Sequence, residues 1–97
     1  LDAVLLGPSD LSGSMGKLLN TADPEVQAAL DTVVAKCRNK RIPVGVALGC
    51  GVGEAAYEPW FRRGVQMMSV VQDVNLLVQA TKENISVMDS RLGQFRV

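Results

Sequence analysis

The segment Leu5–Leu11, which reads LLGPSDL, leads from an apolar stretch directly into a Gly-Pro corner that carries a carboxylate. Gly7 lets the backbone come close to a ligand, and Pro8 stiffens the corner. The N–H groups of Ser9 and Asp10 can then face an anion, while the Asp10 side chain can bind a hard divalent cation. An aspartate after Gly-Pro-Ser is also a common turn or N-cap residue, so spacing alone leaves both interpretations open.

Apolar stretches and helical patterns alternate along the chain. The predicted strands are Ala3–Leu6, Pro43–Leu48 and Met67–Val71. The predicted helices run from Pro24 to an end within Asn39–Arg41, over about Gly53–Arg63 and over about Val74–Leu92. The first strand is a continuous apolar run, which is typical of strands buried on both faces. Three such alternations predict an α/β fold made of right-handed parallel βα units.

The helix boundaries have their own signals. Asp23-Pro24 supplies an N-cap acceptor followed by a proline at the first helical position. The segment Asp10–Asp23 is rich in Ser, Gly and Asn and predicts a long loop with one helical turn near Leu11–Met15. We expect the second helix to bend or restart at Pro59 and to end at Gly64.

Three βα units are too few to distinguish an open doubly wound sheet from a segment of an eightfold barrel. Three parallel strands alone would leave two sheet edges exposed, which an independent domain rarely tolerates. The chain also starts inside a predicted strand. We therefore expect residues 1–97 to be the last part of a larger α/β domain.

Composition argues against several classes of partner. Ten basic and ten acidic residues cancel, so no overall field attracts the chain to nucleic acid or to a membrane surface. Arg38, Lys40 and Arg41 form a local cluster whose ordinary interpretation is a solvated turn that complements a helix dipole. No stretch approaches the roughly 20 apolar residues of a membrane span.

The cysteines do not indicate a zinc site or a disulfide framework. Cys37 and Cys50 lack CxxC spacing, and the sequence has no histidine to complete a zinc ligand set. A reducing compartment is the default for such a chain, and the cytoplasm is the expected location.

Two longer motifs extend the opening segment. Gly7–Gly16, GPSDLSGSMG, is followed by Asp23–Gln27, DPEVQ, which opens a helix. Together they closely resemble the HpcH/HpaI family of metal-dependent, class II pyruvate aldolases, strongly to about Gln27 and loosely over the rest of the chain. The resemblance implies that the three βα units are the last three of a TIM (β/α)8 barrel, with residues 1–97 as the C-terminal part of a single aldolase domain.

The resemblance also implies an activity, that of a carbon–carbon lyase. Such enzymes cleave or form 4-hydroxy-2-keto acids, giving pyruvate or a related 2-keto acid and an aldehyde. A divalent cation such as Mg²⁺, Mn²⁺ or Co²⁺ holds the small 2-keto acid and stabilises the enolate. The family forms homo-oligomers, commonly hexamers, in which the last helices are exchanged between subunits.

Site residues follow from the motif position by position. Asp10 matches a metal-ligating carboxylate, and Ser9 matches the position whose backbone N–H binds the keto-acid carboxylate. Gly7 and Pro8 shape the turn, and Ala47 matches a position that lines the substrate pocket. The family's other metal-ligating glutamate, its arginine near the keto oxygen and its acid–base histidine all precede the matched segment. We therefore expect no catalytic acid or base in this chain, which alone should be inactive.

The chain departs from the family pattern at two places. Val71-Gln72-Asp73 stands where the family has Gly-Val-Asp or Gly-Ser-Asp, and Gly49–Gly53 is richer in glycine than usual. These departures leave open the substrate preference and, to a lesser extent, whether activity is retained. Separately, the sequence does not identify the aldehyde partner or the preferred metal, and it leaves open the use of acyl-CoA substrates.

A nucleotide-binding site is the main alternative. Gly51–Ala56 fits G-x-G-x-x-A between a strand and a helix, and Asp73 lies about 20 residues further on at the end of the next predicted strand, as an NAD or S-adenosylmethionine site requires. Against it, Pro59 falls early in the helix, and the fingerprint belongs on the first strand of a sheet.

A non-catalytic barrel fragment is the other alternative. Leu76, Leu77 and Met88 would then cover a neighbouring subunit, although such a stripe more often packs into its own core. Trp60 and Phe61 are adjacent on a short helix and cannot both face one core, which predicts that one of them lies outside it.

Overall fold

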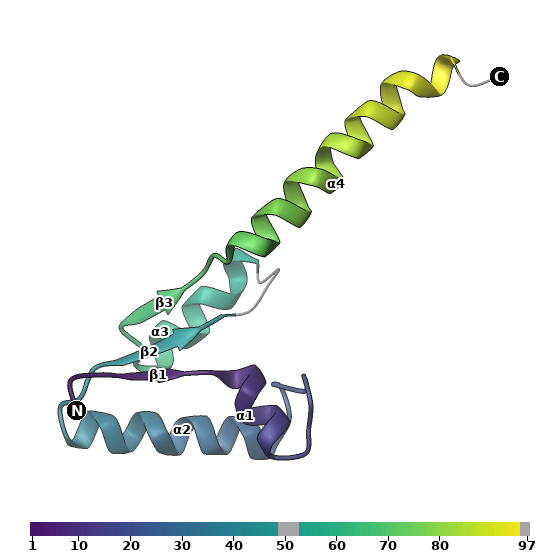
Figure 1. The fold of residues 1–97 in the computed structure, drawn as a ribbon. Helices are drawn as coiled ribbons and strands as arrows, with labels where there is room; N and C mark the ends of the chain where they lie inside the picture. The colour runs from purple at the N-terminus through teal and green to yellow at the C-terminus, as the bar shows by residue number, and fades with distance from the viewer. Residues whose placement is uncertain (49–52, 96–97) are drawn as a thin grey trace.

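The computed structural model describes residues 1–48 and 53–95. A parallel sheet with strand order β1-β2-β3 lies at its centre (Figure 1). In chain order the elements are β1 (Val4–Leu6), α1 (Pro8–Ser14), α2 (Pro24–Asn39), β2 (Val44–Ala47), the 3₁₀ helix η1 (Glu54–Ala56), α3 (Tyr57–Arg63), β3 (Met67–Ser69), α4 (Asp73–Leu92) and the 3₁₀ helix η2 (Gly93–Phe95). The predicted α/β fold with three parallel strands is confirmed.

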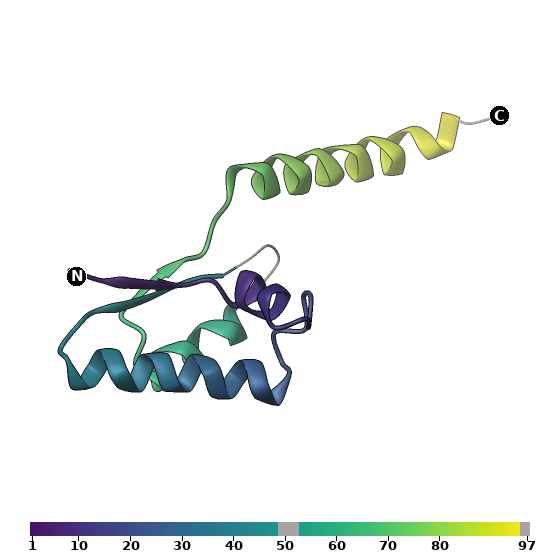
Figure 2. The ribbon, with the colours of Figure 1, turned by 60° about the horizontal axis from the view of Figure 1, so that its bottom comes forward.

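One face of the sheet carries the core. The α2 helix and α3 lie on the same side of the strands (Figure 2). Burial of each large apolar side chain there contributes about 1.5–3 kcal/mol relative to exposure. The buried apolar residues are Leu6, Val26, Leu30, Val34, Cys37, Val44, Val46, Leu48 and Val65.

The opposite face of the sheet is apolar but uncovered. Leu5 and Met67 keep 57% and 54% of their surface exposed. They flank Gly45, where an added Cβ would lie 2.9 Å from Leu5 Cδ1 and 2.7 Å from Met67 Cε. Both faces of the strands are therefore apolar, and only one of them is packed within the described residues.

The α1 helix corrects the prediction of a long loop with a single turn near Leu11–Met15. It begins at Pro8 and runs to Ser14. Pro8 occupies the first turn, where its missing N–H costs nothing. The hydroxyls of Ser12 and Ser14 donate to the carbonyls of Ser9 and Leu11, so residues typical of loops here bond back onto the helix.

The second helix restarts close to Pro59, where a bend or restart was predicted, but not at the proline itself. The change from η1 to α3 occurs at Tyr57, and Pro59 is the third residue of α3. Its missing N–H would have no helical partner at that position. Gly64 ends α3 in the left-handed conformation with φ of 108°, as predicted.

The α4 helix projects away from the rest of the chain (Figures 1 and 2). None of its residues is buried, and Leu76, Leu77 and Met88 are all exposed. The expectation that this stripe packs into the chain's own core is therefore wrong. Across the described ranges, no helix is both long enough and apolar enough to cross a membrane.

Trp60 and Phe61 separate as predicted. Trp60 packs against the core, whereas Phe61 is 58% exposed. The Arg63 guanidinium lies 4.7 Å from the centre of the Trp60 ring, and Arg63 Nε lies 2.8 Å from Asp31 Oδ1. The contact with Asp31 joins α3 to α2, and the contact with Trp60 lies within α3.

Candidate functional site

The candidate site lies at the carboxyl edge of the sheet. Leu6 pairs with Val46, so the next residues, Gly7 and Ala47, leave the two strands side by side. Ala47 pairs in turn with Ser69, the last residue of β3. This is the edge at which parallel α/β folds bind ligands.

Asp10 sits in the first turn of α1, directly after the corner at Gly7. Its carboxylate folds back over Gly7, because a Cβ built there would lie 3.1 Å from Asp10 Oδ2. Leu11 and Met15 pack against the core and anchor the helix. Asp10 itself is exposed, so its carboxylate is available to a ligand.

A hydrogen bond from the buried Ser12 side chain positions the backbone at Ser9. The Ser12 side chain is fully buried, and its Oγ donates to the carbonyl of Ser9 at 2.7 Å. The N–H groups of Ser9 and Asp10 belong to the first helical turn, where no helical carbonyl lies four residues earlier. Those groups and the Asp10 carboxylate belong to the same first turn, so together they can meet an anion and a cation.

Ser12 escaped the sequence reasoning. The signal for it was present, since a serine three residues after Ser9 can return its hydroxyl to the Ser9 carbonyl once the segment is helical. Because a loop was predicted for this segment, the three-residue spacing between Ser9 and Ser12 was not interpreted as a helical contact.

Lys17 also escaped the sequence reasoning. Its Nζ lies 2.9 Å from Asp23 Oδ2 and 3.2 Å from Glu25 Oε2, which joins the segment after α1 to the start of α2. The hydrogen bond raises the pKa of Lys17 and lowers the pKa of Asp23. Asp23 Oδ1 also accepts from the Glu25 N–H at 2.9 Å, so the predicted N-cap is confirmed.

Ala47 and Ser69 border the site from the sheet. Ala47 is half-buried, and Ser69 is exposed beside it. Alternation along the strands places both on the uncovered face with Gly45 and Met67. The predicted third strand continued to Val71, which placed Ser69 mid-strand rather than at the edge.

Asp73 is not at the end of a strand, which corrects a premise of the nucleotide alternative. Strand β3 ends at Ser69, and Asp73 opens α4, where its Oδ1 accepts from the Val74 N–H at 2.7 Å. A ribose-binding acid belongs at the strand's end. Of the two glycines of the fingerprint, Gly51 lies outside the described part of the chain, and Gly53 directly precedes η1.

A metal ion would find one ligand here. In the described residues, no group of three or more His, Cys, Asp or Glu side chains is placed to hold a metal. Mg²⁺ commonly uses one or two protein carboxylates and keeps several waters. The exposed Asp10 carboxylate fits one such ligand, and the described residues do not complete the set.

Comparison with curated proteins finds aldolases. The chain is 26% identical to 2-dehydro-3,6-dideoxy-6-sulfogluconate aldolase of Pseudomonas putida over 91 residues, which covers 94% of the chain and 34% of that protein. It is 30% identical to 5-keto-4-deoxy-D-glucarate aldolase of Klebsiella pneumoniae over 83 residues, which covers 86% of the chain and 31% of that protein. No family model matches the sequence.

Solved structures point the same way. An HpcH/HpaI aldolase/citrate lyase family protein from Burkholderia cenocepacia matches with a TM-score of 0.78 and 28% identity, over 91% of this chain and 33% of that one. The HpcH/HpaI aldolase from Desulfitobacterium hafniense also matches with a TM-score of 0.78, at 26% identity, over 92% of this chain and 34% of that one. Over this span the chain resembles the HpcH/HpaI aldolases in both sequence and fold.

The predicted HpcH/HpaI resemblance is thus confirmed. The chain spans about a third of the length of the family members that it matches. Its three parallel strands correspond to that third of the family's fold.

Proposed function

We propose that residues 1–97 are the C-terminal part of a metal-dependent aldolase with a (β/α)8 barrel. The whole enzyme would cleave or form 4-hydroxy-2-keto acids, giving pyruvate or a related 2-keto acid and an aldehyde. The observation that carries this proposal is the corner Gly7–Asp10, where an exposed carboxylate and two first-turn N–H groups meet at the carboxyl edge of a parallel sheet. Among the relatives is a 4-hydroxy-2-oxo-heptane-1,7-dioate aldolase of Escherichia coli, 30% identical over 82 residues.

The uncovered sheet face supports the barrel. The interior of a (β/α)8 barrel is filled by side chains that point inward from every strand. Leu5, Gly45 and Met67 lie on the face opposite the helices, and both large side chains are more than half exposed. Further strands that close a barrel would cover these residues and pair the open edges of β1 and β3.

Each residue at the corner has a proposed role. Asp10 would bind Mg²⁺, Mn²⁺ or Co²⁺, and the Ser9 N–H would bind the substrate carboxylate. A bound metal ion would supply Lewis-acid stabilisation of charge on the keto acid. Gly7 leaves space for the Asp10 carboxylate, and Pro8 starts the helix that presents it.

Other residues would position or border this corner. Ser12 holds the Ser9 carbonyl from the buried side, and Lys17 fixes the segment that follows α1. Ala47 would line the substrate pocket, and its small side chain leaves room for the substrate, with Ser69 beside it. The remaining metal ligand and the acid–base group would come from other parts of the barrel.

The α4 helix supports an oligomer. Its apolar residues are exposed along most of its length, and a helix of this composition needs a partner surface. We propose that α4 packs against a neighbouring subunit of a homo-oligomer, a hexamer in the whole enzyme.

The test uses the longer polypeptide with Mn²⁺ and a 4-hydroxy-2-keto acid. Asp10→Ala should abolish metal-dependent release of pyruvate. Asp2→Ala removes an equally exposed carboxylate from the other end of β1 and should leave turnover within about twofold. Full turnover in Asp10→Ala would refute the assignment of Asp10, and turnover by residues 1–97 alone would refute the claim that other groups complete the site.

A further inference from the structure

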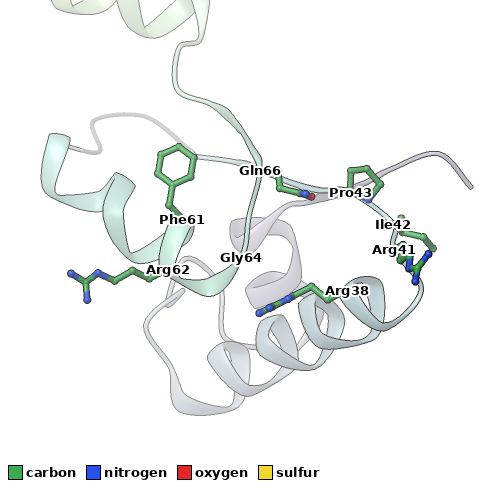
Figure 3. Close-up of a pocket in the computed structure, with 8 residues that line it drawn as sticks. All are labelled: Arg38, Arg41, Ile42, Pro43, Phe61, Arg62, Gly64 and Gln66. Atoms are coloured by element: carbon green, nitrogen blue, oxygen red, sulfur yellow. The ribbon is translucent and has the colours of Figure 1, made fainter.

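A hollow of about 530 Å³ lies at the amino edge of the sheet, opposite the candidate site. It is bounded by the C-terminal ends of α2 and α3 and by the segments that lead into β2 and β3 (Figure 3). Its volume falls within the range of small-molecule sites, about 300–1,000 Å³. Nothing in the proposed aldolase chemistry uses this end of the sheet.

The hollow carries an excess of positive charge. Arg38, Arg41 and Arg62 line it, and no acidic side chain from the described part of the chain does. Arg62 donates from Nε to Glu58 Oε1 at 2.9 Å, and its side chain points away from the other two arginines (Figure 3). Among the residues described, neither Arg38 nor Arg41 has an ion-pair partner or a side-chain hydrogen bond.

Complementing the helix dipole does not account for this arrangement. A basic residue in the last turn of a helix offsets its dipole singly and in any direction. Here Arg38, on α2, and Arg41, in the following turn, line the same concavity as the end of the neighbouring helix α3. The chain as a whole has a net charge of zero, so the excess is local.

The Arg38 side chain lies along one wall of the hollow. A Cβ at Gly64 would lie 3.3 Å from Arg38 Cδ and 3.6 Å from its Nη1, so the side chain runs directly across that glycine. Gln66 is fixed beside it, because its Oε1 accepts from the Val44 N–H at 3.1 Å and its own N–H donates to the Val44 carbonyl at 2.8 Å.

An apolar surface completes the site. The Phe61 ring is 58% exposed and lines the hollow together with Ile42 and Pro43. Aromatic and aliphatic surface beside guanidinium groups suits a ligand with an apolar body and an anionic end.

We propose that this hollow binds a small organic anion, with a carboxylate or phosphate held by Arg38 beside Gly64, Arg41 adding positive charge at the other end of the hollow, and a ring or apolar body against Phe61. Guanidinium groups recognise both kinds of anionic group through paired N–H donors. The site is separate from the Gly7–Asp10 corner and does not depend on the aldolase proposal.

Calorimetric titration of the chain tests the proposal with phenyl phosphate, phthalate and inorganic phosphate as probes. At least one of the two ring-bearing anions should bind with one-to-one stoichiometry and more tightly than inorganic phosphate. The probe that binds better identifies the anionic group as phosphate or carboxylate. Failure of both ring-bearing anions to bind at millimolar concentration would overturn the proposal.

Two matched double variants distinguish binding by the arginines that line the hollow from attraction by nearby positive charge in general. Arg38→Gln with Arg41→Gln should weaken binding at least tenfold. Lys36→Gln with Lys40→Gln removes the same charge from exposed positions that do not line the hollow, and should change affinity less than twofold. Equal losses in both pairs would overturn the proposal.

Two further readouts locate the ligand. Phe61→Ala should weaken the binding of phenyl phosphate or phthalate severalfold and leave the affinity for inorganic phosphate unchanged. In the NMR spectrum of the chain, the amide signals of Gly64 and Gln66 should shift on addition of the anion, while those of Gly7 and Asp10 stay in place. Shifts confined to Gly7 and Asp10 would assign the binding to the other edge of the sheet and contradict the proposal.

Discussion

The two faces of the sheet have similar apolar sequences and different surroundings. On one face, Val44 and Val46 meet the buried side chains of α2, among them Leu30 at 1% exposure. On the other face, Leu5 and Met67 remain more than half exposed, as do most of the large apolar side chains of α4. The difference shows that the apolar pattern of this chain specifies two packing surfaces, and that the described residues supply a partner for one of them.

The largest effect should follow from a cavity in the covered face. Leu30→Ala should lower the free energy of unfolding by about 2–5 kcal/mol, because a fully packed leucine leaves a void that its neighbours fill only in part. Leu77→Ala, on the exposed face of α4, should cost less than about 0.5 kcal/mol in the same chain. Urea denaturation of the two variants measures both values, and equal losses would remove the distinction between the two surfaces.

The cap that starts α2 should have an intermediate effect. Asp23→Ala removes the acceptor for the Glu25 N–H and the partner of Lys17, and should cost about 1 kcal/mol. Asp2→Ala, an exposed carboxylate outside any helix, serves as the control and should be nearly neutral. Thermal unfolding at neutral pH compares them, and a neutral Asp23→Ala would contradict the role of the cap.

The ion pair at this cap should make its contribution depend on pH. The pKa of Asp23 is lowered from 3.8, so its stabilisation is present above that pH and is lost as pH falls through the folded-state value. The pKa of Lys17 is raised from 10.5, so its stabilisation is present below that pH and is lost as pH rises through the folded-state value.

Lys17→Met tests whether the ion pair stabilises the fold only between the pKa of Asp23 and the pKa of Lys17. The stability difference between wild type and variant should be greatest near neutral pH and should shrink in acid below pH 3.8 and in base above pH 10.5. Denaturation curves across the pH range provide the measurement, and a difference that does not vary with pH would rule out the ion pair as its source.

The smallest effect should come from the uncovered face. Gly45→Ala brings a Cβ to within 2.7 Å of Met67 Cε and 2.9 Å of Leu5 Cδ1, but both are the ends of flexible, half-exposed side chains. Their movement should offset the gain of about 0.5–1 kcal/mol from replacing a strand glycine, so unfolding in urea should change little. In the longer polypeptide the same variant should be clearly destabilising if that face is a packed barrel interior, and equal results in the two contexts would argue against the barrel.

The sequence supported prediction of the fold where a signal was local. Asp23-Pro24 marked the start of α2, Gly64 marked the end of α3, and the apolar runs marked the three strands. The α1 helix was missed because its serines favour loops in isolation and become helical only when their hydroxyls bond back to the helix. The exposure of α4 was missed because periodicity identifies an apolar stripe but does not identify what covers it.

In the candidate site, too, residues with a local sequence signal were predicted, and residues whose role depends on folded contacts were not. The corner residues Gly7–Asp10 could be read from their motif, and the structure places them at the carboxyl edge next to Ala47. Ser12 was overlooked because its spacing from Ser9 has meaning only in a helix, and a loop was predicted there. Lys17 could not be recognised, since its contacts with Asp23 and Glu25 exist only once the segment after α1 has folded. Ser69 depended on where β3 ends, and a strand boundary is poorly marked in a continuous apolar run.

The most direct test of the central claim is the affinity of the longer polypeptide for Mn²⁺, followed by loss of the electron paramagnetic resonance signal of the free ion. We expect one tight site per subunit, weakened roughly 100-fold or more by Asp10→Asn, because loss of a direct ligand should cost at least as much as loss of the outer partners of a metal site. Asp2→Asn should leave the affinity unchanged. Wild-type Mn²⁺ affinity in Asp10→Asn would contradict the proposal that this corner is part of a metal site.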